Sequence, residues 1–228
     1  MRNLTCVLSI DAMAHPRCVG WGEMGLDYHY DNSPRDIQQK VFIRQLKQAV
    51  KLGKPLTIHT READDDTERI LKEHVPQEHK VQHHRHIVKF ADVVQIHIHC
   101  FTDSPGFARR LLDYFLNLYI GITGVISYST NKDTSTVVSE LATRSSTPLD
   151  GPLPGTNLRI LLETDAPYMV PANLYESLPP LKGARIPLCH SAMIPWTADF
   201  VANVAGQGWD AEKVMRDARE NARKVYGV

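Results

Sequence analysis

The stretch LLETDAPY at residues 161–168 says most about the fold when it is read together with three earlier segments of the same design. In each of the four, an apolar run rich in branched side chains ends at a histidine or a carboxylate. The other three are GWGEMGLDY at 20–28, TIHTRE at 57–62 and IHIHCFT at 96–102, and the residues in question are Glu23, His59, His99 and Asp165. A barrel or open parallel sheet presents strand ends to one shared pocket, so we expect these four side chains to form one site.

Between and around these segments, strand-like and helix-like stretches alternate along the chain. We expect strands at 18–27, 55–59, 93–99, 118–124 and 158–167. Helices are expected at 4–14, 36–52, 62–74, 107–116, 136–143, 196–205 and 211–225, and an irregular, proline-rich connection at 167–195. In the 36–52 helix, the apolar positions expected on one face are Ile37, Val41, Leu46, Ala49 and Val50. The alternation predicts an α/β fold with a parallel sheet, either open or closed.

Composition limits the class of protein. The 228 residues are 43% hydrophobic, which suits a single domain spanning 1–228, and 26 basic residues balance 26 acidic ones, so no overall positive field points to nucleic acid. No apolar run is long enough for a membrane span, and no secretory signal is seen. The four cysteines are far apart in the sequence, which favours a reducing location. We therefore expect an intracellular protein, cytoplasmic or nuclear, without a membrane partner.

The recurrence of carboxylate and imidazole groups indicates bound metal. These groups supply the oxygen and nitrogen ligands that suit zinc, manganese or magnesium. A carboxylate can also bridge two ions, which then polarise a phosphoryl group and lower the pKa of a bound water. The four segments thus favour a metal-dependent hydrolase that needs no protein nucleophile.

The same segments, with LYIGITG at 118–124 and the closing ENARKVYG at 220–227, resemble the successive motifs of the TatD family of metal-dependent deoxyribonucleases, part of the amidohydrolase-like TIM-barrel group. The resemblance implies a (β/α)8-type barrel and cleavage of DNA phosphodiester bonds with divalent ions, two in an intact site. It implies Glu23 as the bridging carboxylate and His59 and His99 as imidazole ligands. Asp165 would be the last-strand ligand, placed to take a proton from the attacking water. Asp165 and Glu23 are therefore the expected catalytic residues.

The sequence also departs from the family pattern at its beginning. Only 22 residues precede Glu23, where family members have a first strand ending in His-x-His and two further strand and helix units. The expectation is an incomplete barrel with about five of the eight strands and a weakened site for one ion. The sheet edges left exposed would be places for self-association.

Each of these residues also has a structural interpretation. Glu23 and Asp165 could cap turns, and His59 could be an ordinary core histidine. His97, on the same face as His99 but two residues deeper in the strand, is expected to be a core histidine.

Three weaker candidates lie outside the four positions. Arg61 could reach a substrate phosphate or form an ion pair with Glu62 or Asp64, and Tyr168 could stack on a base or be an ordinary loop aromatic. The cluster of His83, His84 and His86 resembles a metal-binding tract but is expected to be a solvated connection.

Two other functions remain open from the sequence. The first is an amidohydrolase acting on a small cyclic amide or ester, since that chemistry uses the same ligands. The second is an inactive fragment that serves as an interaction module through an exposed sheet edge.

Overall fold

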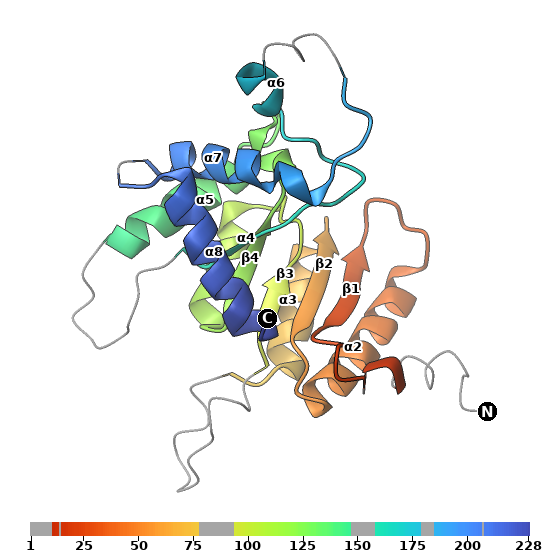
Figure 1. Ribbon diagram of the computed structural model, residues 1–228. Helices are drawn as coiled ribbons and strands as arrows, with labels where there is room; N and C mark the ends of the chain where they lie inside the picture. Colours follow the sequence, from red (N-terminus) through yellow and green to blue (C-terminus); the bar gives the residue numbers. More distant parts are fainter. Residues whose placement is uncertain (1–10, 14, 78–93, 147–157, 179–184, 207) are drawn as a thin grey trace, which may run out of the picture. The chain divides into compact units, whose positions relative to one another are not determined.

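The computed structural model describes residues 11–13, 15–77, 94–146, 158–178, 185–206 and 208–228 (Figure 1). Its sheet has five strands in the hydrogen-bonded order β1-β2-β3-β4-β5. They are β1 (Trp21–Asp27), β2 (Leu56–Arg61), β3 (Ile96–Ile98), β4 (Leu118–Ile122) and β5 (Ile160–Leu162). The α/β class and the five expected strands are confirmed, although β3 and β5 are shorter than the sequence suggested.

The contacts divide the chain into two compact units. The first comprises Met1–Ile98, Leu111–Leu118 and Val225–Val228, and the second comprises His99–Arg110 and Tyr119–Lys224. The expectation of one domain over 1–228 stays a prediction.

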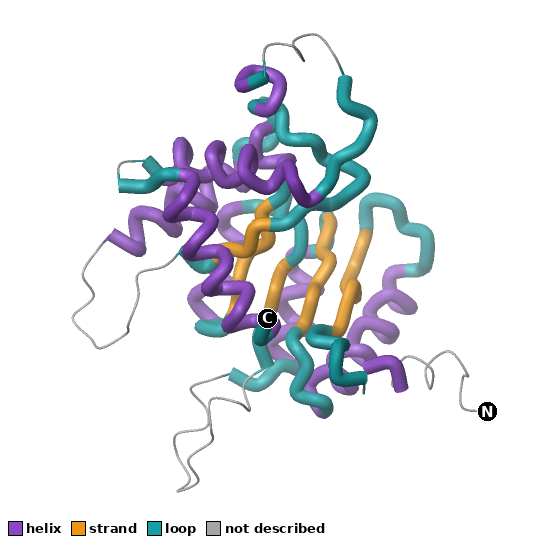
Figure 2. Tube along the Cα trace, in the orientation of Figure 1, coloured by secondary structure: helices purple, strands orange, loops and turns teal. Residues whose placement is uncertain are grey.

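In the first unit, β1, β2 and β3 lie side by side (Figure 2), and both pairs of neighbouring strands are parallel. Two helices, α2 (Arg35–Lys51) and α3 (Asp64–His74), cover the strands: α2 packs on β1 and α3 on β2. Pro34 precedes α2, and Gly53, with a φ of 62°, follows its last turn. This is the conformation in which glycine is favoured at a helix end.

The buried face of α2 differs from the expected one. Leu46 and Ala49 are buried as predicted, together with Phe42, but Ile37 and Val41 are 43% and 50% exposed. The apolar stripe at 42, 46 and 49 follows the helical repeat and already covers β1, so Ile37 and Val41 fall on the outer side.

A group of hydrogen-bonded polar side chains, of which His97 is buried and the other two are half-buried, joins the C-terminal residues to β2 and β3 in the first unit. The hydroxyl of Tyr226 lies 2.7 Å from Nδ1 of His97 and 2.9 Å from Oγ1 of Thr57. His97 is only 4% exposed, as expected of a histidine in the core. The hydrogen bonds offset the cost of burying these polar atoms next to apolar strands.

The second unit contains β4, β5 and most of the remaining helices. These are α4 (Pro105–Tyr114), whose last residues belong to the first unit, η3 (Gly124–Ser127), α5 (Asp133–Ser146), α6 (Leu174–Ser177), η5 (Ser191–Met193), α7 (Ile194–Ala205) and α8 (Ala211–Tyr226). Helix α7 packs on α5, η3 and β5. Asn221 of α8 donates hydrogen bonds from Nδ2 to the backbone oxygens of Leu158 and Ile160, at 2.6 and 2.9 Å, and so fixes α8 to β5.

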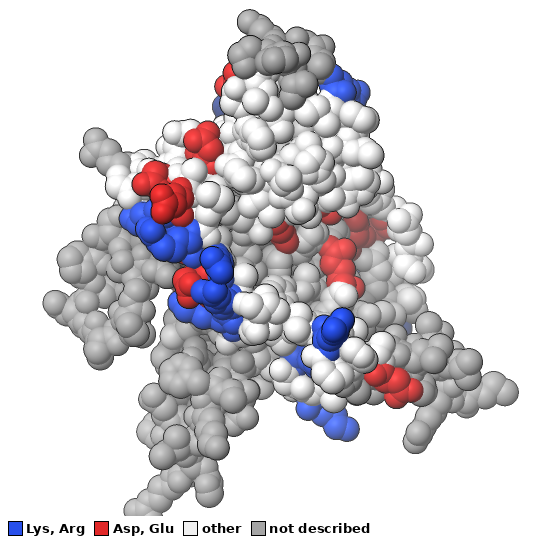
Figure 3. Space-filling view, viewed as in Figure 1, with Lys and Arg blue, Asp and Glu red and all other residues white. Residues whose placement is uncertain are grey.

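The surface charges of α8 are mixed rather than gathered by sign. Acidic and basic side chains alternate along α8 (Figure 3), and Arg223 there pairs with Glu220 at 2.7 Å. The expected irregular connection at 167–195 is interrupted by the short helices α6 and η5, so that part of the prediction was wrong. Among the described residues, no helix is both long and apolar enough to cross a membrane.

Candidate metal centre

The first unit places Glu23 and His59 next to each other on neighbouring strands. Glu23 is the third residue of β1 and His59 the fourth residue of β2, so both lie within their strands and not at the strand ends that the sequence suggested. Strand β1 bulges between Trp21 and Met24, and the two strands then run in register as far as Asp27 and Arg61. Oε1 of Glu23 lies 3.8 Å from Nδ1 of His59. Ligand atoms sit about 2.0–2.2 Å from zinc, so two ligands of one ion lie roughly 3–4 Å apart. The pair therefore has the spacing of a shared ion.

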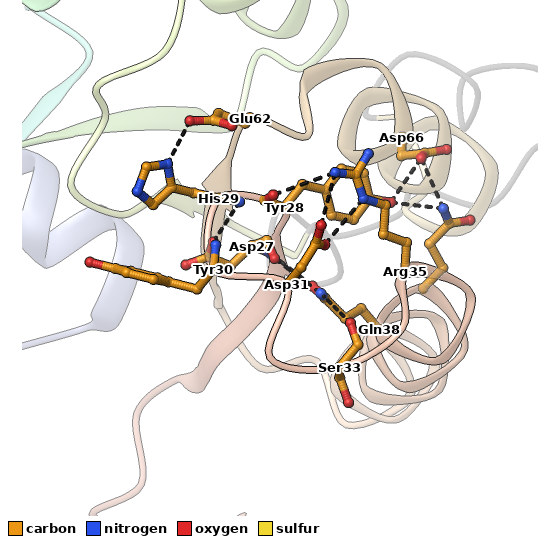
Figure 4. A network of polar contacts seen from close by, with 11 residues as sticks. Asp27, Tyr28, His29, Tyr30, Asp31, Ser33, Arg35, Gln38, Glu62 and Asp66 are labelled. Atoms are coloured by element: carbon orange, nitrogen blue, oxygen red, sulfur yellow. Dashed lines mark hydrogen bonds and ion pairs between the residues drawn. The ribbon is translucent and has the colours of Figure 1, made fainter.

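Asp27, at the end of β1, holds the other nitrogen of that imidazole. Its Oδ2 lies 3.4 Å from Nε2 of His59. Its Oδ1 accepts hydrogen bonds from the backbone N–H groups of His29 and Tyr30, each at 3.0 Å (Figure 4). Burial opposes ionisation of Asp27, but the two N–H groups and His59 outweigh it and hold the pKa of Asp27 below its ordinary value. An ionised Asp27 keeps the proton of His59 on Nε2 and leaves Nδ1 to face Glu23.

The second unit repeats this arrangement with His99, Glu163 and Asp165. Nε2 of His99 lies 3.7 Å from Oδ1 of Asp165, again the spacing of two ligands on one ion. Nδ1 of His99 lies 3.0 Å from Oε2 of Glu163. Oε1 of Glu163 accepts a hydrogen bond from the backbone N–H of Cys100 at 2.6 Å, which fixes the carboxylate. The proton of His99 is thus directed to Nδ1, and Nε2 is left for a metal.

Cys100 stands beside this group. It has a left-handed φ of 45°, rare for a residue with a side chain, and it directly follows His99. His99, Cys100 and Asp165 each offer a ligand atom, and these atoms lie within 4.8 Å of one another. The thiol contacts Thr123 and Met169 at 3.5 and 3.4 Å.

The donor sets fit divalent metal. Each group offers one imidazole nitrogen and one carboxylate, and each imidazole is oriented through its second nitrogen by another carboxylate. Such outer carboxylates are typical of histidines that bind metal, since they fix the tautomer and raise ligand basicity. Ordinary core histidines need no carboxylate on both sides, so the structural interpretation of His59 is disfavoured.

The structure pairs the four predicted residues within the two units: Glu23 with His59, and His99 with Asp165. Asp165 is not required to close its turn, because its backbone oxygen does so by accepting from the N–H of Tyr168 at 2.8 Å. The carboxylate is thereby left for His99.

Asp27 and Glu163 belong to the site although neither was predicted from the sequence. Both could have been found from the strand period. Asp27 is four residues after Glu23 and Glu163 is two before Asp165, so on the strands expected at 18–27 and 158–167 each falls on the same face as a predicted ligand, although β5 itself ends at Leu162.

The weaker candidates have varied settings. The guanidinium of Arg61 lies over the ring of Tyr30, with Cζ 5.0 Å from the ring centre, whereas Glu62 pairs with His29 at 2.7 Å (Figure 4). The side chain of Tyr168 is 70% exposed. The cluster of His83, His84 and His86 lies outside the described residues.

Comparison with known proteins gives consistent results. The family model described as "TatD related DNase" matches residues 2–227. The chain is 35% identical over 220 residues to the human 3'-5' RNA nuclease TATDN2, and the match covers 96% of this chain and 24% of that protein. It is 30% identical over 215 residues to the uncharacterized metal-dependent hydrolase YabD of Bacillus subtilis, covering 94% of this chain and 68% of that protein.

A solved structure shares the fold. The crystal structure of YJJV, a TATD homologue from Escherichia coli K12, aligns with a TM-score of 0.71 at 22% identity, covering all of this chain and 72% of that one. The parallel α/β architecture predicted from the sequence is therefore that of a known TatD homologue.

Proposed function

Because the chain belongs to the TatD-related DNase family, we propose that it is a divalent-metal-dependent hydrolase that cleaves phosphodiester bonds of nucleic acid, with DNA as the expected substrate. The observation that carries the proposal is the repeated histidine geometry. In each unit one imidazole nitrogen stands 3.7 or 3.8 Å from a ligand carboxylate while the other is held by a second carboxylate. Relatives named as a nuclease and as a metal-dependent hydrolase support the same chemistry.

The roles of the residues follow from their settings. Glu23 and His59 would hold metal in the first unit, and His99 and Asp165 in the second. Divalent ions bound there would supply a water of lowered pKa and a positive charge for the phosphate oxygens. Asp165 accepts the proton of the attacking water, because its carboxylate is not used to close its own turn. Asp27 and Glu163 keep the two imidazoles in the required tautomers.

Two further residues would contact the substrate. Arg61 offers a guanidinium at the end of β2, fit to bind a phosphate in a bidentate manner, and stacking on Tyr30 limits its rotamers. Tyr168, three residues after Asp165, presents an exposed ring on which a base can stack.

The test is the substitution Asp165→Asn in the metal-loaded protein. We expect it to lower kcat on a single-stranded DNA oligonucleotide by about 10²- to 10⁴-fold, the usual contribution of a general base, without changing the thermal unfolding midpoint by more than a few degrees. The matched control is Asp199→Asn, an exposed carboxylate on α7, which should leave kcat unchanged. Full activity in Asp165→Asn would overturn the mechanism.

The same assay separates the substrate classes. Single-stranded DNA and RNA are offered beside a hydantoin and a lactone, each with Mg²⁺, Mn²⁺ or Zn²⁺ and after chelation. Turnover of oligonucleotides alone, lost on chelation, is the expected result. Turnover of the cyclic compounds alone would establish the amidohydrolase alternative, and no turnover in any arm would favour an interaction module.

A further inference from the structure

The second unit contains a cavity that the proposed metal chemistry does not use. It measures about 390 Å³, within the range of small-molecule sites. Its walls come from three segments: Tyr128 after η3, the stretch from Pro167 to Tyr175, and Arg185 to Pro187. Three of its lining residues are tyrosines, and most of the others are apolar.

Hydrogen bonds hold these walls together. The backbone N–H of Ile186 donates to the hydroxyl of Tyr175 at 3.0 Å, and that of Cys189 donates to the oxygen of Pro167 at 2.9 Å. On the opposite side, the N–H of Ala172 donates to Oγ of Ser127 at 2.7 Å. The three segments are thus tied to one another, and the cavity is formed before any ligand arrives.

The wall beside Tyr128 is also tightly packed. A Cβ atom added at Gly124 would lie 2.3 Å from the backbone oxygen of Met169, so only glycine permits this approach. Met169 itself has a left-handed φ of 61°. The close approach of Gly124 in η3 to the backbone of Met169 therefore fixes the turn that carries Tyr168.

The chemistry of the lining selects a class of ligand. Arg185 is the one charged residue among the described residues that line the cavity, and within the described part of the chain it makes no ion pair. A single cation beside three tyrosine rings favours a ligand that is both anionic and aromatic. The hydroxyl of Tyr128 adds a hydrogen-bond donor, since burial, with Cys189 and Tyr175 nearby, raises its pKa and keeps it protonated.

We propose that this cavity is a nucleotide subsite, in which Tyr168 stacks on the base next to the scissile phosphate and Arg185 binds that nucleotide's phosphate. The inference rests on the proposed function, and it specifies how that function selects its substrate. The position fits: Pro167 and Tyr168 line the cavity and follow Asp165 within three residues, in the same unit as His99. A base held there places the adjoining phosphodiester beside the carboxylate that accepts the proton.

The subsite predicts that an unpaired base is needed for efficient cleavage. A base within a duplex has both faces covered by its neighbours and its edge paired, so it cannot enter a cavity lined by tyrosines. Stacking of one base on an aromatic side chain accounts for about 10- to 100-fold in affinity and varies little with base identity. The expected substrate is therefore single-stranded, with weak sequence preference.

The test removes the substrate base, with an abasic nucleotide, and the ring of Tyr168, by substitution, in separate experiments. Oligonucleotides are made with a normal base or with an abasic sugar at the nucleotide next to the cleaved bond, as deoxyribose and as ribose versions. The wild-type protein should cleave the base-containing strand with a kcat/KM about 10- to 100-fold above that of the abasic strand. In Tyr168→Ala this preference should fall to near one, and Tyr168→Phe should restore it. The deoxyribose and ribose arms identify which nucleic acid supplies the nucleotide.

Arg185→Ala tests the phosphate contact. It should weaken both strands equally and lower the slope of log affinity against log salt by about 0.7, the value for one phosphate contact on a single strand. Arg219→Ala, an exposed arginine on α8, is the matched control and should change neither quantity.

Failure of the subsite and failure of the proposed function give different results. Equal cleavage of the two strands by wild-type protein, or an equal loss on both in Tyr168→Ala, would overturn the subsite and leave the hydrolase intact. Absence of hydrolysis with every metal would overturn the hydrolase. The subsite would then be decided by fluorescence anisotropy in EDTA, where base-dependent binding lost in Tyr168→Ala supports it and base-independent binding overturns it.

Discussion

The two histidine groups have the same design but different surroundings. In the second unit, the side chains of the ligand pair His99 and Asp165 are 15% and 37% exposed. In the first unit, the side chains of His59 and Glu23 are 35% and 50% exposed. Water and salt screen charges more strongly at exposed positions, so identical residue types exert weaker forces in the first unit.

The outer carboxylates differ in the same direction. One oxygen of Glu163 lies 3.0 Å from Nδ1 of His99, and the other accepts a hydrogen bond from the backbone N–H of Cys100 at 2.6 Å. Both oxygens therefore fix the segment that carries His99. Asp27 uses Oδ1 for the turn at 29 and 30 and approaches His59 at 3.4 Å with Oδ2. The second group is therefore largely ordered by the protein, whereas the first depends more on the ion it would bind.

The largest expected effect comes from disrupting the first group through its backbone. A Cβ atom at Gly25 would lie 1.7 Å from the backbone oxygen of His59, and Gly25 has a φ of 155°. Gly25→Ala should lower the free energy of unfolding by about 3 kcal/mol or more, because β1 and β2 must separate where Glu23 and His59 meet. Urea denaturation followed by circular dichroism measures the loss.

Substitutions at two other glycines give stability losses with which the loss in Gly25→Ala can be compared. Gly124→Ala, which meets the oxygen of Met169 at 2.3 Å, should cost about 1–3 kcal/mol. Gly106→Ala is the control, because its nearest neighbour is the end of the Arg110 side chain at 3.8 Å. If Gly25→Ala unfolds at the same urea concentration as Gly106→Ala, the close pairing of β1 and β2 is not as described.

The next effect contrasts the two groups through their outer carboxylates. Loss of such a group typically weakens metal binding by about 10- to 100-fold, and we expect Glu163→Gln near the upper end and Asp27→Asn near the lower. The amide introduced by Glu163→Gln can donate to Nδ1 of His99, which moves the ring proton to Nε2, the nitrogen that faces Asp165. Calorimetric titration with Zn²⁺ or Mn²⁺ measures both variants.

Both substitutions keep the oxygen that serves the backbone, so the local turns are preserved and the difference concerns the imidazoles. Asp199→Asn again serves as the control. Equal losses in the two variants, or a larger loss in Asp27→Asn, would contradict the view that the second group is the more strongly ordered.

How far the sequence predicts this molecule depends on the range of the interactions. The five strands and the ligands on or shortly after them follow from local patterns, since apolar runs that carry a histidine or a carboxylate are visible in the chain itself. The exact strand ends do not follow, because Glu23 and His59 lie within β1 and β2 and Asp165 lies beyond β5. The hydrogen bond between Tyr226 and His97 joins residues 129 positions apart, and no local sequence pattern predicts it. The cavity at Tyr128 and Arg185 likewise depends on a turn fixed by the contact of Gly124 with Met169. Contacts between residues so far apart in the sequence are determined by tertiary packing, which cannot be inferred from a single sequence.

The smallest effect is a contrast in pH dependence between the two units. In the first, the hydrogen bond from Arg69 above all, helped by Tyr28 and opposed by burial, lowers the pKa of Asp66 below 3.8. In the second, burial raises the pKa of Asp217 above 3.8, although Lys213 and other cations oppose it. The two carboxylates should therefore act on stability with opposite signs.

The stability from Asp66 is complete above the unfolded pKa and is lost as pH falls through the lower folded value. Asp66→Asn should thus be less stable than wild type by at most about 1 kcal/mol near neutral pH, and equal to it in strong acid. Ionisation of Asp217 lowers the stability of the folded protein, and this loss is complete above the raised folded pKa and absent below 3.8. Asp217→Asn should therefore be more stable than wild type at neutral pH, and the difference in stability should disappear in acid. Urea midpoints between about pH 2.5 and pH 7, measured with a chelator present, give both curves. Parallel curves for the two variants would show that the carboxylates do not differ in environment, since only opposite shifts in pKa can make one gap negative and the other positive.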